Sequence, residues 1–434
     1  MKKMVCFGFM VTVFLVGMGY GVPHAQADSR RDPLIDKLID KGVITEEEAS
    51  AIEKEEETLK AHGKAKGDKH MALPKGLKGV SVGMLAYIDY SSGVEPEHGD
   101  DESSYNEFRL TRGYFTVKKE LFPWMHTRVT IDTHQDDTGD YKNRLKYLYA
   151  ELRPPDFGLF TDMKSEIGLG HIPWLDFEEH INPYRCQGTM AIERAGTFNS
   201  ADTGVSLRGY FGGKLKDAAE KTGSHYYDGR YGSWHLGVYN GSGYHASEEN
   251  NNKALEGRLT VRPLPDVIPG LQLSYFGICG EGNKEASNGD YPDYNVNLGM
   301  LSYEHPRATI TAQYFQTEGH AKGNWVDPVT GDALETAGYS FFGKVKLPVL
   351  DEKLSLFARY DHFDQDDDDK IADDTAYDMF MSGLAWDVYK GNLLMLVYET
   401  TDYEDNAGKK TKVPEVDSAL GDDHRIQAVW QIKF

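Results

Sequence analysis

Cysteine is scarce in this 434-residue sequence, which contains only three. Cys6 lies in an apolar run at the N-terminus, so only Cys186 and Cys279 remain in the rest of the chain. Their number and spacing exclude a disulfide-rich scaffold and the common cysteine sites for zinc or haem. The sequence leaves open whether these two thiols form one bridge or stay reduced.

Positive charge is also scarce, with 47 Lys and Arg against 69 Asp and Glu and a net charge of −22. Such a charge disfavours binding to duplex nucleic acid or to an anionic bilayer surface, so we expect no nucleic-acid partner.

Catalytic motifs are absent from the sequence. It contains no His-Glu-x-x-His motif and no phosphate-binding loop. Its Gly-x-Ser-x-Gly spacing, GVSVG at residues 79–83, lies within a predicted strand and is therefore not a nucleophile elbow between a strand and a helix. Its scattered histidines and serines, such as His171, His235, His362 and Ser274, do not form a recognisable nucleophile–base pair. We therefore expect no enzymatic activity, no metal site and no cofactor.

Long hydrophobic runs are missing beyond the first residues. Lys2 and Lys3 precede an apolar run over residues 4–18, and residues 25–27 (AQA) form a small-x-small cleavage site. The run is shorter than the ~20 residues that a membrane-spanning helix needs, which disfavours a retained anchor. The pattern predicts a signal peptide over residues 1–27, cleaved near Ala27, and hence export from the cytoplasm.

The mature chain divides into three predicted parts. Residues 28–60 show helical periodicity, interrupted at Gly42 and resumed at a capping box of Thr45 and Glu48, which predicts a periplasmic helical hairpin or coiled-coil stub. Residues 61–74 are a polar linker. Residues 75–434 read as strands and turns, and form the third part.

Units of roughly ten residues, apolar at alternate positions and separated by turn residues, repeat along this third part. In one unit Val205 and Leu207 alternate with Ser206 and Arg208. About sixteen such strands are expected, over residues 79–91, 106–118, 124–134, 144–153, 164–172, 203–211, 231–240, 254–263, 270–278, 294–304, 307–317, 336–347, 353–364, 376–388, 391–403 and 423–434.

Connection length alternates along the predicted strands. Connections after odd strands are long and polar, whereas most connections after even strands are tight; residues 212–230 depart from this rule. The last strand places Ala428, Trp430, Ile432 and Phe434 on one face, which suits contact with lipid. These features predict an all-β fold, a transmembrane antiparallel barrel in the bacterial outer membrane with a short N-terminal helical segment. An edge strand of a secreted sandwich is the alternative for the C-terminal pattern.

The long connection over residues 173–202 is rich in aromatic and charged residues. A sixteen-stranded barrel leaves an aqueous channel that something must narrow if solutes are to be selected. We expect this loop to fold into the lumen, with Arg185, Glu193 and Arg194 as constriction candidates. An outer lid that never enters the pore is the alternative.

Several segments together resemble the phosphate-selective porin O/P family of outer-membrane channels. They are GVSVG at the start of residues 79–90, FRLTRGYF at 108–115, IER at 192–194, DTGVSLRG at 202–209 and VYNGSG at 238–243; DKGVITEE at 40–47 is similar to the N-terminal leader of such porins. The resemblance implies a sixteen-stranded, homotrimeric diffusion channel for small hydrophilic solutes, with outer-membrane lipid and lipopolysaccharide as its surroundings.

The resemblance further implies that lumenal Arg and Lys set an anion preference. Strand parity points seven basic side chains inward: Arg208, Arg258, Arg262, Lys344, Lys346, Arg359 and Arg425. Guanidinium groups suit oxyanions such as phosphate because they present several donors in a fork. Glu256 and Asp361 share these faces, so the basic residues could instead only balance acidic ones, as in a general channel.

Acidic residues gather in the expected outer loops, most densely at Asp364, Asp366 to Asp369, Asp373 and Asp374. Such a loop could hold divalent cations that bridge surface glycolipid, or it could simply be a solvated, repelling loop. Two other functions stay open. The barrel could sheathe an electron conduit whose haem belongs to a partner cytochrome, or the N-terminal helices could tether the cell envelope.

Overall fold

The computed structural model describes residues 45, 75–97, 102–136, 138–409, 413–421 and 423–434. The predicted signal peptide (1–27), helical segment (28–60) and linker (61–74) lie outside the described residues, except for Thr45. Contacts divide the chain into two units, residues 1–78 and 79–434, and the second unit is the barrel.

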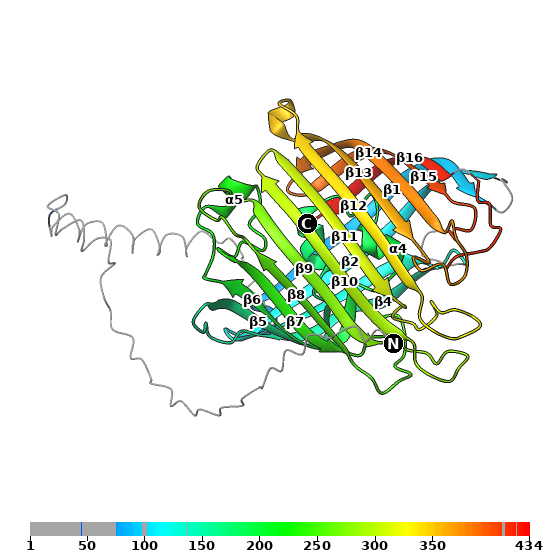
Figure 1. Ribbon diagram of the computed structural model, residues 1–434. Helices are drawn as coiled ribbons and strands as arrows, with labels where there is room; N and C mark the ends of the chain where they lie inside the picture. The colour runs from blue at the N-terminus through cyan, green and yellow to red at the C-terminus, as the bar shows by residue number, and fades with distance from the viewer. Residues whose placement is uncertain (1–44, 46–74, 98–101, 137, 410–412, 422) are drawn as a thin grey trace. The chain divides into compact units, whose positions relative to one another are not determined.

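Sixteen strands pair in sequence order, and β1 pairs with β16, so the sheet closes into an antiparallel barrel (Figure 1). This confirms the predicted fold class. The strands are β1 (Val80–Pro96), β2 (Glu102–Phe122), β3 (Met125–Gln135), β4 (Tyr141–Leu152), β5 (Phe160–His171), β6 (Ala201–Phe211), β7 (Gly232–Tyr239), β8 (Ala254–Val261), β9 (Leu271–Glu281), β10 (Asp293–His305), β11 (Ala308–Glu318), β12 (Glu335–Lys346), β13 (Leu354–Asp364), β14 (Ala376–Tyr389), β15 (Asn392–Tyr403) and β16 (Asp423–Lys433).

The described helices are short. They are the 3₁₀ turns η1 (Lys75–Leu77) and η2 (Leu350–Glu352) and the α-helices α3 (Leu175–Ile181), α4 (Ala191–Ala195) and α5 (Ala218–Thr222). Within the described part of the chain, no helix has the length and apolar character that a membrane crossing requires.

Each predicted strand has a counterpart in the barrel, and the two ends of the barrel differ in the lengths of their connections. Residues 123–124, 306–307 and 390–391 form the tightest connections after even strands, whereas residues 172–200 separate β5 from β6. The exception noted in the sequence persists, because residues 212–231 form a long connection at the short-turn end. That connection contains α5 and an isolated bridge between Lys214 and Gly229.

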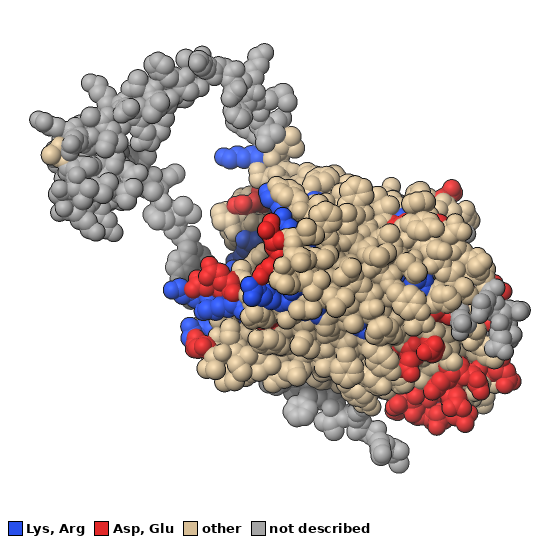
Figure 2. All heavy atoms as spheres, turned by 90° about the horizontal axis from the view of Figure 1, so that it is seen from above, with Lys and Arg blue, Asp and Glu red and all other residues tan. Residues whose placement is uncertain are grey.

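Alternation along the strands separates an apolar outer face from the lumen. In β8, Leu255 and Leu259 are 53% and 49% exposed, whereas Glu256 and Arg258 are 3% and 2% exposed. In β16, Trp430 is likewise exposed and faces outward. Figure 2 shows the result on one flank, where a band almost free of charged side chains lies between a mainly basic end and an acidic end.

Part of the lumen departs from the usual outward-apolar, inward-polar pattern. Apolar inward side chains occur on each of β9 to β16 and are densest on β14 and β15, where Met379, Met381, Met395 and Val397 are each 4% exposed or less. β14 and β15 are therefore apolar on both faces along much of their length, which is typical of strands that are buried on both sides. Something inside the barrel must cover them.

Candidate functional site

The connection over residues 172–200 lies inside the barrel and covers these apolar inward side chains. Its buried side chains, among them Trp174, Leu175, Phe177, Met190 and Ile192, belong to one hydrophobic cluster with inward residues of β9 to β16. The Trp174 ring stacks on Phe276 of β9 at 5.6 Å. Burial of these apolar surfaces is the main force that holds the loop in the lumen.

Buried polar contacts fix the loop to the wall at several points. Glu399 of β15 accepts hydrogen bonds from Arg194 Nη1 at 2.9 Å and from Gln187 Nε2 at 2.8 Å. Arg359 of β13 donates to the Thr189 carbonyl at 2.6 Å. These contacts satisfy backbone and side-chain groups that water would otherwise have to reach.

Arg258 of β8 holds the start of the loop. Its Nε donates to the Pro173 carbonyl at 3.0 Å, and its guanidinium lies 4.1 Å from the centroid of the Phe177 ring. Tyr227, from the long connection at the short-turn end, packs edge-on against Phe177 at 5.1 Å, and its hydroxyl donates to Asp176. Residues 212–231 therefore reach inward and support α3, which accounts for the extra length of that connection.

Among the cavities of the described residues, two lie beside the loop. The larger, of about 690 Å³, is lined by residues near the short-turn end such as Arg153, Lys214 and Phe434. The smaller, of about 320 Å³, is lined by Asn324 and other residues of the long connections. The two cavities meet along β2 and β4. Arg112 of β2 and Arg144 of β4 line the smaller cavity, and the next inward residues, Tyr114 and Lys146, line the larger one.

The larger cavity is basic although the chain as a whole is acidic. Ten Lys and Arg line it against four Asp and Glu. The basic residues are Lys118, Arg128, Lys146, Arg153, Lys164, Arg185, Arg208, Lys214, Arg258 and Lys433, and the acidic ones are Glu151, Asp162, Asp176 and Glu179. An anion in this cavity would meet a surplus of positive charge.

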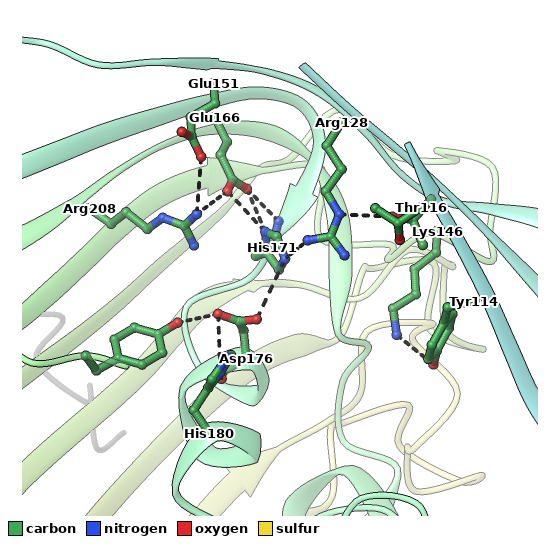
Figure 3. Close-up of polar contacts among 12 residues, drawn as sticks. Tyr114, Thr116, Arg128, Lys146, Glu151, Glu166, His171, Asp176, His180 and Arg208 are labelled. Atoms are coloured by element: carbon green, nitrogen blue, oxygen red, sulfur yellow. Dashed lines mark hydrogen bonds and ion pairs between the residues drawn. The ribbon is translucent and has the colours of Figure 1, made fainter. Parts of the chain in front are cut away.

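A polar network joins α3 to the barrel wall inside the larger cavity (Figure 3). Arg208 Nη2 lies 2.6 Å from Glu166, and Glu166 lies 2.9 Å from Nδ1 of His171. Arg128 Nη1 lies 3.2 Å from Nε2 of His171. An arginine can only donate, so Nε2 accepts, and Nδ1 carries the proton that His171 donates to Glu166.

Asp176 and Arg185 of the loop are buried charged groups with displaced pKa values. Burial alone would raise the pKa of Asp176, but the surrounding basic groups, His180 and Arg208 among them, hold it below its usual value. Burial alone would lower the pKa of Arg185, but the carboxylates of Glu193 and Glu179 raise it. Both groups therefore stay charged at neutral pH.

Glu178 behaves in the opposite way. Its side chain is buried, and burial raises its pKa to about 7 even though Arg359, Trp174 and Gln313 favour the charged form. Its carboxyl oxygens lie 2.7 Å from Trp174 Nε1 and 3.0 Å from Gln313 Nε2.

The seven predicted pore-lining residues occupy different environments. Arg208 and Arg258 line the larger cavity. Arg262 is buried and donates to the carbonyls of Gly229 and Pro269. Arg359 pairs with Asp361, and Arg425 lies 3.1 Å from Glu399. Lys344 lies 5.9 Å from the Tyr184 ring centroid, and Lys346 is half-buried at the end of β12. Most of these side chains are thus engaged by the loop or the wall.

The three constriction candidates lie on the lumenal loop. Arg185 Nη2 lies 3.1 Å from Glu193, and these residues line the larger and smaller cavity respectively. Arg194 instead points to the opposite side and pairs with Glu399.

Several lining residues were not singled out from the sequence, chiefly Lys118, Arg128 and Lys146 on β2, β3 and β4. The alternation of Arg112, Tyr114 and Lys118 with apolar residues was a usable signal for β2. For β4 the signal was weaker, because a bulge interrupts its alternation.

The two described cysteines form no bridge, and the described residues offer no metal site. Cys186 and Cys279 do not form a disulfide, and Cys186 Sγ lies 3.4 Å from Met395 Sδ. Among the residues with described positions, no group of three or more His, Cys, Asp or Glu is arranged to hold a metal ion.

The sequence matches no protein-family model and no curated protein. Its fold is similar to solved structures of outer-membrane porins. An anion-selective porin from Comamonas acidovorans matches with a TM-score of 0.54 at 11% identity, over 82% of this chain and 100% of that porin. OmpF of Salmonella typhi, in a complex with daunomycin, matches with a TM-score of 0.54 at 10% identity, over 82% and 97% of the two chains. At such identities the likeness establishes the fold, a closed porin-type barrel, and the finer resemblance to phosphate-selective porins is not confirmed.

Proposed function

We propose that this chain is an outer-membrane porin that lets small hydrophilic solutes diffuse passively and favours anions. The observation that carries the proposal is the basic larger cavity, with ten Lys and Arg against four Asp and Glu in a chain whose net charge is −22. The charge of a confined path affects permeating ions more strongly than screened charge on the outer loops does.

Figure 2 is consistent with a barrel that spans a membrane, since an almost uncharged flank lies between two charged ends. The porin fold of the structural neighbours supports the outer membrane as the location. Homotrimer formation and contact with lipopolysaccharide rest on the family resemblance and belong to the proposal, as does the constriction by Arg185 and Glu193.

Specific selection of phosphate has less support than general anion preference. Among the predicted lumenal cations, Arg208 is close to Glu166, Arg359 to Asp361, and Arg425 to Glu399. Cations that are already paired offer a phosphate group less binding energy. The alternative of a sheath for a cytochrome is disfavoured because the loop packs inside the lumen and occupies space that a partner cytochrome would need. The tether concerns residues outside the described part of the chain.

The test is the reversal potential of the purified full-length protein in a planar bilayer under a potassium chloride gradient, repeated with potassium phosphate added. We expect chloride to permeate faster than potassium, and phosphate to reduce the current without abolishing it. Cation selectivity would mean that the acidic loops govern the pore, and the anion proposal would then be wrong. Absence of conductance would reject the porin proposal and favour the sheath or the tether.

A further inference from the structure

A β-bulge in β4 turns one lysine into the lumen. Thr130 of β3 pairs with Tyr147 and Ile131 pairs with Leu145, so Lys146 is the extra residue between them. Lys146 and Tyr147 are consecutive, yet both line the larger cavity and each is 7% exposed. Bulges are often found next to functional sites because they redirect a side chain.

The Lys146 ammonium is surrounded by tyrosines. Its Nζ donates to the Tyr114 hydroxyl at 3.0 Å and lies 4.5 Å from the centroid of the Tyr114 ring. It also lies 5.6 Å from the Tyr147 ring centroid and 6.0 Å from that of Tyr244. Within the described residues, no carboxylate lies within 4 Å of it. Glu179 is the nearby acidic group of the loop, and it pairs with Arg185 instead.

Arg128 is the second cation of this cluster. Its guanidinium lies 4.5 Å from the Tyr147 ring centroid, and it contacts Thr130 Oγ1 and His171 Nε2, which are both neutral partners. It too has no carboxylate within 4 Å among the residues whose positions are described. The neighbouring lumenal arginines differ: Arg112 and Arg144 both contact Asp132.

A cation removed from water without a counter-ion is costly, and aromatic rings compensate only part of that cost. An anion that entered between Lys146 and Arg128 would supply the counter-ion that these two cations lack among the described residues. The cavity that they line holds seven tyrosines and one tryptophan and has a volume of about 690 Å³. Cavities of this size with aromatic walls and a few placed polar groups are typical of sites for organic ligands, whereas an inorganic anion needs no such wall.

We propose that Lys146 and Arg128 form a binding subsite for an organic anion, a carboxylate carried on an aromatic ring. The carboxylate contacts the two cations, and the ring lies against the tyrosine side chains of the cavity. This inference rests on the proposed channel function, since the solute must reach the cavity by diffusion through the barrel.

The test uses the full-length protein, with benzoate as the probe and acetate and inorganic phosphate as comparison anions. Calorimetric titration in detergent measures binding, and block of the chloride current in a planar bilayer measures occupancy of the path. We expect benzoate to bind roughly tenfold more tightly than acetate, because only benzoate adds contacts to aromatic side chains. Lys146→Gln should weaken benzoate binding by roughly tenfold, since it removes a charge-assisted contact.

Two control variants test whether a loss of benzoate binding is caused by loss of the Lys146 charge in the cavity. Lys146→Arg keeps the charge and should keep most of the benzoate binding. Lys353→Gln removes one exposed positive charge outside the lumen and should bind benzoate as the wild type does. Equal binding of benzoate and acetate, or an unchanged affinity in Lys146→Gln, would overturn the subsite while leaving an anion-selective porin intact. Benzoate binding without any conductance would instead reject the proposed function and leave the subsite standing.

Discussion

At the scale of single residues, Glu178 links the stability of the lumenal loop to pH. Its pKa is about 7 in the folded protein against an ordinary value of 4.5, so the folded state holds this proton more tightly than the unfolded chain does. The resulting stabilisation is fully present below about pH 4.5 and is lost as the pH rises through 7. Its full size is on the order of 3 kcal/mol.

We therefore expect the wild type to be more stable towards urea at pH 5 than at pH 8, measured by tryptophan fluorescence. Glu178→Gln cannot ionise but keeps contacts to Trp174 and Gln313, so it should flatten this pH dependence. Glu220→Gln removes an exposed carboxyl of α5 and should leave it unchanged. An equally steep pH dependence in Glu178→Gln would show that another group is responsible.

At the scale of elements, the lumenal loop depends on a small number of buried anchors as well as on apolar packing. Glu399 accepts contacts from Gln187 and Arg194 of the loop and from Arg425 of β16, and its side chain is 2% exposed. Removal of one partner of a buried ion pair leaves a charge that is poorly compensated. The anchor therefore holds the loop in place only as long as the set is complete.

Arg194→Met should lower the free energy of unfolding by on the order of 3 kcal/mol, since Glu399 loses its bidentate partner. The variant should also show noisier open-channel current, because the loop is held less firmly. Arg230→Met breaks an exposed pair with Asp266 and should cost less than about 1 kcal/mol. Urea unfolding of both variants checks the difference, and similar losses in the two would contradict the anchoring role.

At the scale of the whole molecule, charges of opposite sign occupy different places. The larger cavity is basic, whereas the connection over residues 365–375 carries six aspartates, of which Asp367 to Asp369, Asp373 and Asp374 are exposed. Exposed charges are screened over about 10 Å at 0.1 M salt and about 3 Å at 1 M. Charges in a confined lumen are screened less.

We expect anion selectivity, measured as a reversal potential, to persist when salt is raised from 0.1 M to 1 M. The triple variant Asp367→Asn, Asp369→Asn and Asp373→Asn should increase anion selectivity at 0.1 M and have no effect at 1 M. A loss of anion selectivity at high salt in the wild type would place the selective charges on the surface instead of in the lumen.

Local pattern was sufficient for the barrel itself. Along each strand, successive side chains alternate between the two faces of the sheet. In β8, Leu255 and Leu259 lie on the outer face and Glu256 and Arg258 on the inner face. The lengths of the connections likewise distinguish the two ends of the barrel. Strand number, the approximate position of each strand and an outward Trp430 could therefore be predicted from one sequence, whereas several strand bounds differ by three to five residues, as for β2 (Glu102–Phe122, predicted over 106–118).

The arrangement inside the lumen could not be predicted in this way. Arg258, Arg359 and Arg425 have the right parity to line a pore, but the loop or an acidic neighbour occupies them. Contacts between the loop and the wall join residues up to 212 positions apart, such as Gln187 and Glu399. No local pattern specifies such a pairing.

The sequence by itself determined the class of fold, the strand order and the two-sided character of the wall, because these follow from periodicity and turn chemistry within each strand. Only the tertiary structure decided where the remaining path lies, because packing of the loop against apolar inward side chains of β9 to β16 leaves space beside β1 to β8. It also decided that Lys146 faces this space, since a single extra residue in β4 shifts the side-chain alternation and depends on the register with β3.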